Sequence, residues 1–140
     1  MSADKPRYCC AVIEDTQNRL LLQLRPADAV FASGLMTCFG GAREQHESAE
    51  ACLQREIAEE LACQIRSSRP QCDLYRDGEW IARFYHCDLD RLPTHAVEPG
   101  HIAVWAPWSS LPGLPVSHWH ALVLQAIRAG HLRVDARSRG

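Results

Sequence analysis

The chain has 140 residues, of which 46% are hydrophobic and 23% are charged, as in an ordinary globular protein long enough to bury a core. Fifteen lysines and arginines against seventeen aspartates and glutamates give a formal net charge of −2, so electrostatics favour neither a nucleic acid nor a membrane as partner. We expect one cytoplasmic domain over residues 1–140, because no apolar run approaches the roughly 20 residues of a membrane span and the polar start MSADKPR is no signal peptide.

The first third of the chain predicts three short strands, over residues 8–13, 19–24 and 36–39. Residues 15–18, with the sequence DTQN, supply the turn between the first two strands. Residues 25–35 contain proline, aspartate, serine and glycine, which is typical of a surface loop. The third strand is predicted to lead directly into the pair Gly40-Gly41.

A long helix is predicted next. Ser48 is a suitable N-cap, and the helix should run to Leu61. Within it, Leu53, Ile57 and Leu61 follow one another at i, i+4 and i+8, which places them in one buried stripe.

The second half of the chain predicts three more strands and a closing helix, over residues 72–75, 80–87, 102–105 and 117–129. Asp77-Gly78 is a two-residue hairpin signal, and Ser117 and Gly130 are suitable residues to begin and end the helix. Residues 1–6 and 133–140 are expected to be flexible tails. This order of elements indicates an α/β (α+β) protein with a mixed β-sheet and helices on its faces.

The seven cysteines are expected to be buried free thiols. Their number is odd, no Cys-x-x-Cys pair occurs, and most lie in apolar segments, which argues against a disulfide framework or a zinc site. His118 and His120 begin the predicted last helix, where side chains two residues apart diverge, so they are not expected to bind a metal together.

The long helix concentrates acids on one side. Glu56, Glu59 and Glu60 stand at i, i+3 and i+4, within about 100° of one another around the helix axis. Their repulsion should cost a few tenths of a kcal/mol per pair unless a cation neutralises it. Clustered carboxylates suit Mg²⁺ or Mn²⁺. A solvated acidic face is the ordinary alternative, but it explains neither Gly41 nor the spacing from Glu47 to Arg55.

Residues 41–63, GAREQHESAEACLQREIAEELAC, resemble the signature of the Nudix hydrolases: Gly, five residues, Glu, seven residues, Arg-Glu, an aliphatic, any residue, Glu-Glu, any residue, Gly and an aliphatic. The matching residues are Gly41, Glu47, Arg55, Glu56, Ile57, Glu59 and Glu60. If each of the six fixed Gly, Glu and Arg positions arises by chance in about 1 case in 15, coincidence amounts to about 10⁻⁷ per start site. The resemblance implies the αβα sandwich of the Nudix fold.

Three positions depart from the family pattern. Ala62 replaces the glycine that usually ends the helix in a left-handed conformation, so the turn must either adapt or bear strain of about 1 kcal/mol. His46 replaces another common glycine, and Phe39 occupies a position that is often proline. Cys63 is a lenient match for the last aliphatic. These departures affect the shape of the loop and remove no metal ligand.

The resemblance implies a role for each matching residue. Glu56, Glu59 and Glu60 would be catalytic metal ligands, joined by the carbonyl of Gly41, and the implied cofactor is Mg²⁺, with Mn²⁺ as the alternative. Arg55 and Glu47 would form a salt bridge that fixes the loop against the helix.

Four further residues are site candidates. Glu98 lies seven residues before Trp105, much as an additional catalytic or metal-binding Glu does in some small family members, although a solvated loop acid is the alternative. Arg25 is a candidate for contact with a substrate phosphate or sugar, or is simply a surface arginine. Phe39 and Gly40 are the other two candidates for substrate binding.

The predicted function is metal-dependent hydrolysis of a diphosphate bond in a nucleoside diphosphate linked to a group X. A nucleoside triphosphate is the first choice of substrate, because the chain is short and undecorated. Specificity for 8-oxo-dGTP does not carry over, since residues 116–119 lack the Asn that sanitising relatives use there. ADP-ribose, nucleotide sugars and dinucleoside polyphosphates stay open, as does a homodimer.

The alternative from another class is a sensor that keeps the fold and binds a nucleotide without cleaving it. Loss of metal ligands would favour a sensor, whereas Glu56, Glu59 and Glu60 are all present.

Overall fold

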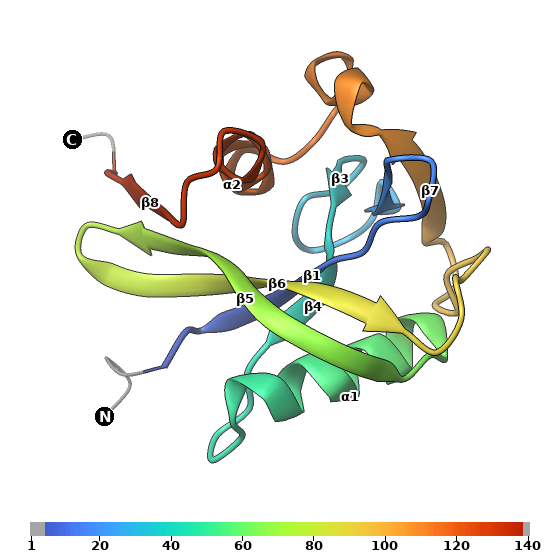
Figure 1. Ribbon diagram of the computed structural model, residues 1–140, viewed down its shortest axis with the longest axis horizontal. Helices are drawn as coiled ribbons and strands as arrows, with labels where there is room; N and C mark the ends of the chain where they lie inside the picture. The colour runs from blue at the N-terminus through green and yellow to red at the C-terminus, as the bar shows by residue number, and fades with distance from the viewer. Residues whose placement is uncertain (1–4, 139–140) are drawn as a thin grey trace.

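The computed structural model describes residues 5–138, which form two β-sheets and two α-helices (Figure 1). A mixed sheet has the strand order β4-β1-β6-β5-β8. Its strands are β1 (Tyr8–Val12), β4 (Phe39–Ala42), β5 (Ile65–Arg76), β6 (Glu79–Leu89) and β8 (Arg133–Ala136). A small antiparallel sheet has the order β3-β2-β7 and contains β2 (Arg19–Leu24), β3 (Met36–Thr37) and β7 (Ile102–Pro107).

The two helices lie on opposite faces of the mixed sheet (Figure 1), so the predicted mixed sheet with helices on its faces is confirmed. They are α1 (Ala49–Leu61) and α2 (His118–Arg128), and a 3₁₀ helix, η2 (Trp108–Gly113), follows β7. Within residues 5–138, no helix has the length and apolar character needed to cross a lipid bilayer.

Two apolar cores form because β1 points alternate side chains to its two faces. Cys9 and Ala11 pack toward α1, whereas Cys10 and Val12 pack into the core that contains α2. The predicted stripe of α1 is buried against the first core, with Ile57 completely inaccessible to solvent. All seven cysteines are buried free thiols, as predicted.

The chain passes from the small sheet to the mixed sheet at Cys38. The predicted strand over residues 36–39 is therefore two strands, β3 on β2 and β4 on β1. The pair Gly40-Gly41 lies inside β4 and not after it. A Cβ atom on Gly40, whose φ is 142°, would lie 2.1 Å from the carbonyl oxygen of Cys9, so only glycine allows this approach of β4 to β1.

The hairpin of β5 and β6 is longer than predicted. Its first part is polar and exposed and contains Pro70, which hides the strand from a pattern search, and the register shifts between Pro70 and Cys72. The expected flexible tail from residue 133 is wrong for Arg133–Ala136, which pair with β5 as strand β8. The guanidinium group of Arg133 lies 3.7 Å from the ring centroid of Tyr75 on β5. Residues 1–4 and 139–140 of the expected tails lie outside the described residues.

The helix ends follow the sequence in part. Ser48 caps α1 as predicted, because its Oγ accepts a hydrogen bond of 3.1 Å from the backbone N–H of Ala51. Of the two alternatives for Ala62, the structure shows the strained one, because this residue keeps the left-handed conformation with φ 54° and ψ 37°. Ser117 precedes α2 but makes no capping hydrogen bond with its side chain, so that expected cap is not formed.

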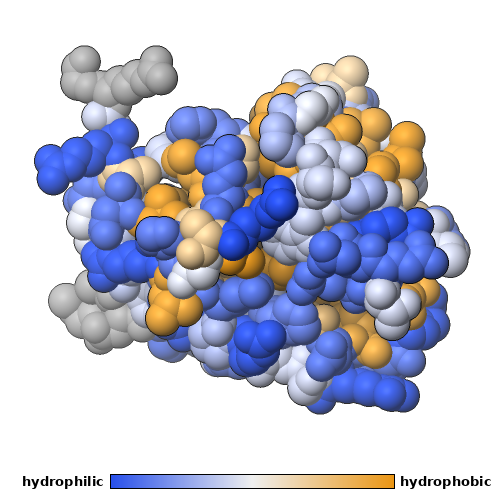
Figure 2. All heavy atoms as spheres, turned by 45° about the horizontal axis from the view of Figure 1, so that its top comes forward, coloured by the Kyte–Doolittle hydropathy of each residue, from blue (hydrophilic) through white to orange (hydrophobic). Residues whose placement is uncertain are grey.

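Apolar residues on the face shown in Figure 2 lie in separate patches with polar residues between them. The β2–β3 loop contains two highly exposed large apolar side chains, Val30 and Phe31. This loop adjoins the β6–β7 loop, since a Cβ atom on Gly100 would lie 3.4 Å from Cβ of Pro26.

Candidate active site

Arg55 and Glu47 form the predicted ion pair, which joins α1 to the loop before it. Arg55 donates from Nε to Glu47 Oε2 (2.8 Å) and from Nη2 to Glu47 Oε1 (2.9 Å), and Nη2 also donates to the carbonyl of Ala42 (3.2 Å). Hydrogen bonds from Arg55 hold the pKa of Glu47 at about 2. The two-point pairing fixes the loop geometry, because a guanidinium matches a carboxylate in both position and direction.

Glu56 lies directly beneath Gly41. A Cβ atom on Gly41 would lie 2.5 Å from Glu56 Oε1, so a side chain at this position would displace the carboxylate. Glu56 Oε1 also accepts a hydrogen bond of 2.9 Å from Nη1 of Arg55. Burial raises the pKa of Glu56, while Arg55 opposes this shift.

Glu60 is the most buried acid of the group, with 5% of its surface exposed. Its Oε1 accepts a hydrogen bond of 2.9 Å from the backbone N–H of Gly40. Burial, with smaller contributions from the charges of Glu56 and Glu98, raises the pKa of Glu60 to about 8. The β4 glycines thus lie over two carboxyl groups whose ionised forms are disfavoured by burial.

Glu59 takes a different place. Its side chain is 58% exposed, and one oxygen lies 3.6 Å from Nη1 of Arg55. The structure therefore brings Glu56 and Glu60 together under the glycines and leaves Glu59 at the solvent-facing edge.

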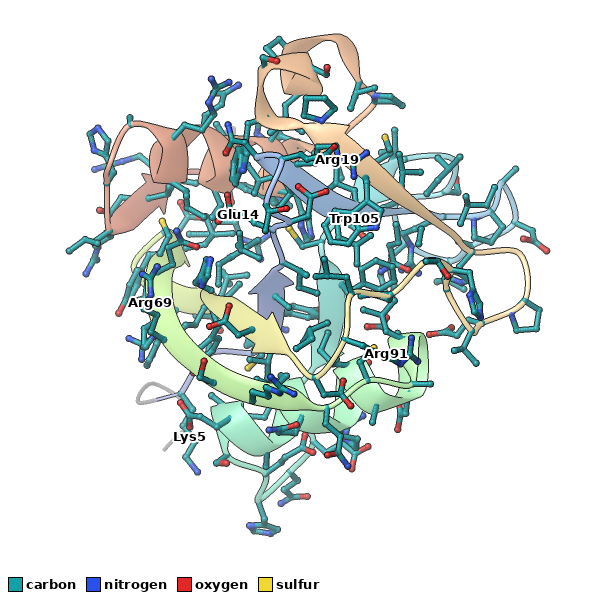
Figure 3. All side chains as sticks on the ribbon, turned by 45° about the vertical axis from the view of Figure 1, so that its right-hand side comes forward. Lys5, Glu14, Arg19, Arg69, Arg91 and Trp105 are labelled. Carbon is teal, nitrogen blue, oxygen red and sulfur yellow. The ribbon has the colours of Figure 1, made fainter. Side chains whose placement is uncertain are left out.

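The β6–β7 loop brings Glu98 to the same end of the molecule. The indole Nε1 of Trp105 donates to the carbonyl of Pro93 (3.0 Å), and Arg91 donates to the carbonyl of Ala62 (3.0 Å) at the end of α1 (Figure 3). The backbone N–H of Val97 donates to the carbonyl of Glu60 (2.9 Å). Glu98 is close enough to raise the pKa of Glu60, although its own side chain is 45% exposed.

Arg25 and Phe39 are not part of this cluster. Arg25 donates from Nε to the carbonyl of Phe31 (2.8 Å) and so holds the β2–β3 loop. Phe39 is completely buried in the core on the α1 side. Its side chain therefore cannot contact a substrate, contrary to the prediction that Phe39 binds the substrate. Only the backbone of Phe39 could contribute to a binding surface.

Two residues near Glu98 were not predicted from the sequence. Gln23 is 2% exposed in the middle of β2, and its Oε1 lies 2.9 Å from Nδ1 of His101. An amide within the apolar run of residues 20–24 was the available signal, because a buried amide requires hydrogen-bond partners.

The donors at this site fit a hard divalent cation in their chemistry. They are carboxylate oxygens, and the raised pKa values of Glu56 and Glu60 show that added positive charge would stabilise their ionised forms. Within residues 5–138 no group of three acidic, histidine or cysteine side chains is already arranged around a common point. Glu56 instead bonds to Arg55, and Glu60 to Gly40.

A mixed sheet lies between two helices, and the acidic helix α1 lies beneath a glycine pair. This arrangement is the Nudix hydrolase fold. The chain belongs to the Nudix family, since the family model described as NUDIX domain matches residues 4–127. It is a Nudix pyrophosphohydrolase, as predicted. No curated protein sequence matches it.

Solved structures of Nudix proteins are similar to this chain. A MutT NUDIX hydrolase from Burkholderia pseudomallei has 26% identity and a TM-score of 0.71, with 86% of this chain and 97% of that chain covered. The ORF135 protein of E. coli has 26% identity and a TM-score of 0.71, with 87% of each chain covered. A structure from a study of MutT from Aliivibrio salmonicida and Vibrio cholerae has a TM-score of 0.76 at 20% identity, with 89% and 98% covered, and supports the fold alone.

Proposed function

We propose that this protein is a Mg²⁺-dependent hydrolase that cleaves nucleoside triphosphates to a nucleoside monophosphate and pyrophosphate. The observation that carries the proposal is the pair Glu56 and Glu60, held under Gly40 and Gly41, where burial raises the pKa of both carboxyl groups. Such a pair has little use in a structural helix and a direct use where a cation and a polyphosphate bind.

Glu56 and Glu60 are the proposed inner ligands, and the exposed Glu59 and the carbonyl of Gly41 complete the donor set. Mn²⁺ is the alternative ion. When bound, the cation would neutralise charge on the diphosphate oxygens and so favour attack at phosphorus. Arg55 holds Glu47 and Glu56 through charge-assisted hydrogen bonds, so we assign it to positioning and not to phosphate contact.

Glu98 is the proposed general base. Glu56 and Glu60 already accept hydrogen bonds from Arg55 and Gly40, whereas Glu98 projects from a loop and is accessible to water. Its carboxylate takes one proton from the attacking water as the new oxygen–phosphorus bond forms, and the bond to the leaving pyrophosphate breaks. The proton then passes from Glu98 to solvent, which restores the site.

The nucleoside would lie between the β2–β3 and β6–β7 loops. Arg25 and the backbone around Gly40 are the proposed contacts to phosphate or sugar. The proposal treats the chain as a single domain acting in the cytoplasm, a reducing compartment that suits seven free thiols.

A substrate panel tests this function. The four ribonucleoside and four deoxyribonucleoside triphosphates are compared with ADP-ribose, a nucleotide sugar and a dinucleoside polyphosphate, each with Mg²⁺ and with Mn²⁺. We expect pyrophosphate release from at least one triphosphate and none without a divalent cation. If only ADP-ribose or only the nucleotide sugar is hydrolysed, that compound's class is the substrate class of this site. If none of the compounds is hydrolysed, the proposal is contradicted.

A further inference from the structure

His120, in the first turn of α2, is a histidine that the proposed mechanism does not use. Its Nδ1 accepts a hydrogen bond of 3.1 Å from the backbone N–H of Cys38. The ring of Phe84 on β6 packs against it edge to face, with ring centroids 5.4 Å apart. Backbone hydrogen bonds of Met36 also join β3 to the residues just before α2. The His120 ring is therefore held between α2, β6 and the crossing from β3 to β4.

The contact with Cys38 determines which ring nitrogen of His120 carries hydrogen. A backbone N–H can only donate, so Nδ1 must be the acceptor and has no hydrogen. Burial, with a smaller contribution from the charge of Arg25, lowers the pKa of His120 to about 4, so the ring is neutral at physiological pH. A neutral imidazole has one ring N–H, which must then be at Nε2. His120 thus offers a ligand a donor at Nε2 and no acceptor.

The Nε2–H group of His120 is accessible to a ligand. Among residues 5–138, Gln71 Oε1 is the one side-chain oxygen or nitrogen that is both inaccessible to solvent and without a hydrogen-bond partner. Nε2 of His120 has no partner among the same residues, so solvent must reach it, and the residue as a whole is only partly buried. A donor in a fixed position is therefore free to bind an acceptor that is not part of the chain.

This donor lies close to the proposed nucleotide site. Cys38, which holds the His120 ring, stands two residues before Gly40, whose N–H binds Glu60, and two residues of extended chain span roughly 7 Å. Arg25, the proposed contact to phosphate or sugar, is near enough for its charge to lower the pKa of His120. The base and the phosphates are attached to opposite ends of the sugar. A nucleotide with its phosphates at the acids and its sugar beside Arg25 would therefore extend its base toward the start of α2.

We propose that the Nε2–H of His120 donates a hydrogen bond to a carbonyl oxygen of the nucleobase, so that the site favours nucleotides of keto bases. This inference rests on the proposed function, in which a nucleoside triphosphate is the substrate. Guanine, hypoxanthine, uracil and thymine have an oxygen on the edge where adenine and cytosine have an amino group. An amino group there would face the imidazole with a second donor and leave both donors unpaired, which weakens binding.

Two pairs of triphosphates isolate this contact. ITP and ATP, like UTP and CTP, differ only at the carbonyl or amino group and the ring nitrogen next to it. In the pair that the wild-type enzyme hydrolyses faster, we expect kcat/KM to be at least about 10-fold higher for the keto member. Hydrolysis without this preference would refute the inference and leave the proposed function intact, because the two make separate claims about the same rates.

His120→Asn removes the donor and keeps the contact with the backbone. The Asn carbonyl can occupy the place of Nδ1 and accept from Cys38, but no atom replaces Nε2. We expect KM for the keto member to rise about 10-fold with little change in kcat, so that the two members of the pair come within about 2-fold in kcat/KM. His118→Asn is the matched control, because His118 is exposed in the same helical turn, and it should keep the wild-type preference.

The ratio within a pair distinguishes base recognition from a folding defect. A helix displaced by the substitution would raise KM for both members and leave their ratio unchanged. A His120→Asn variant that keeps the wild-type ratio would therefore overturn the proposal, whatever its melting temperature.

The metal-free protein provides a readout that does not depend on turnover. The ¹⁵N chemical shifts of the His120 ring should show hydrogen on Nε2. The monophosphates IMP or UMP should shift the Nε2–H signal, whereas AMP and CMP should not. Hydrogen on Nδ1 of the free protein, or keto monophosphates that shift the signal no more than the amino ones, would contradict the arrangement even if no triphosphate is hydrolysed.

Discussion

At the residue scale, the fold buries Glu60 and so disfavours its ionised form, whereas the proposed metal binding requires that form. Its pKa is about 8 in the folded protein against 4.5 for an ordinary Glu, mainly because of burial. Between these two pH values the folded protein keeps a proton on Glu60 that the unfolded chain has lost. The metal-free folded state thus binds more protons, and its stability must fall as pH rises through this window.

The free energy of unfolding of the metal-free protein should therefore decrease from about pH 4.5 to about pH 8, by on the order of a few kcal/mol. Glu60→Gln should remove most of this decrease, because the amide has no proton to lose. Denaturant titrations at a series of pH values measure the effect. Glu59→Gln, at an exposed position of the same helix, should leave the slope unchanged, and an unchanged slope in Glu60→Gln would disprove the assignment.

Arg55→Lys tests the bidentate pair. An ammonium group cannot form both hydrogen bonds to Glu47 while also reaching Glu56, so we expect activity to fall at least about 10-fold. Steady-state kinetics measure the loss. The control is Arg83→Lys, since Arg83 makes a comparable two-point pair with Asp73 (2.8 and 3.0 Å) outside the site, and it should leave kcat unchanged. Equal losses in both variants would show that the effect is not specific to the site.

At the scale of the elements, Ala62 ends α1 at a conformational cost. Its φ of 54° is in the left-handed region, which a Cβ atom disfavours. Ala62→Gly should raise the free energy of unfolding by up to about 1 kcal/mol. Ala58→Gly, at an exposed position inside the same helix, should lower it by about 1 kcal/mol. Thermal or chemical unfolding measures the stability of both variants. An Ala62→Gly variant that is less stable than wild type would contradict the claim that Ala62 is strained.

Elements with a regular apolar pattern were predictable from the sequence. The pattern of β2 and the stripe and N-cap of α1 fixed their bounds closely, because local periodicity and capping determine them. β8 was not predictable, because Arg133–Ala136 become a strand only through pairing with β5, a segment distant in the chain. The division of residues 36–42 between two sheets likewise depends on how closely β4 approaches β1.

At the scale of the whole molecule, the candidate site combines one local motif with parts from three other segments. The spacing from Glu47 to Arg55 and Glu56 is local to one loop and helix, so the sequence could predict their pairing. The burial of Glu60 under β4, and the link from Gln23 to His101, arise from the packing of both sheets around α1 and the β6–β7 loop. No spacing rule along the chain predicts those contacts.

The central claim is that a divalent cation and the buried acids of α1 carry out diphosphate hydrolysis together. The most direct measurement is the initial rate of pyrophosphate release from the preferred triphosphate, with Mg²⁺ and with excess EDTA, for wild type and for Glu60→Gln. We predict activity only with the cation, and a kcat at least about 10²-fold lower in Glu60→Gln although the variant stays folded. Full turnover in excess EDTA, or a Glu60→Gln variant as active as wild type, would contradict the claim.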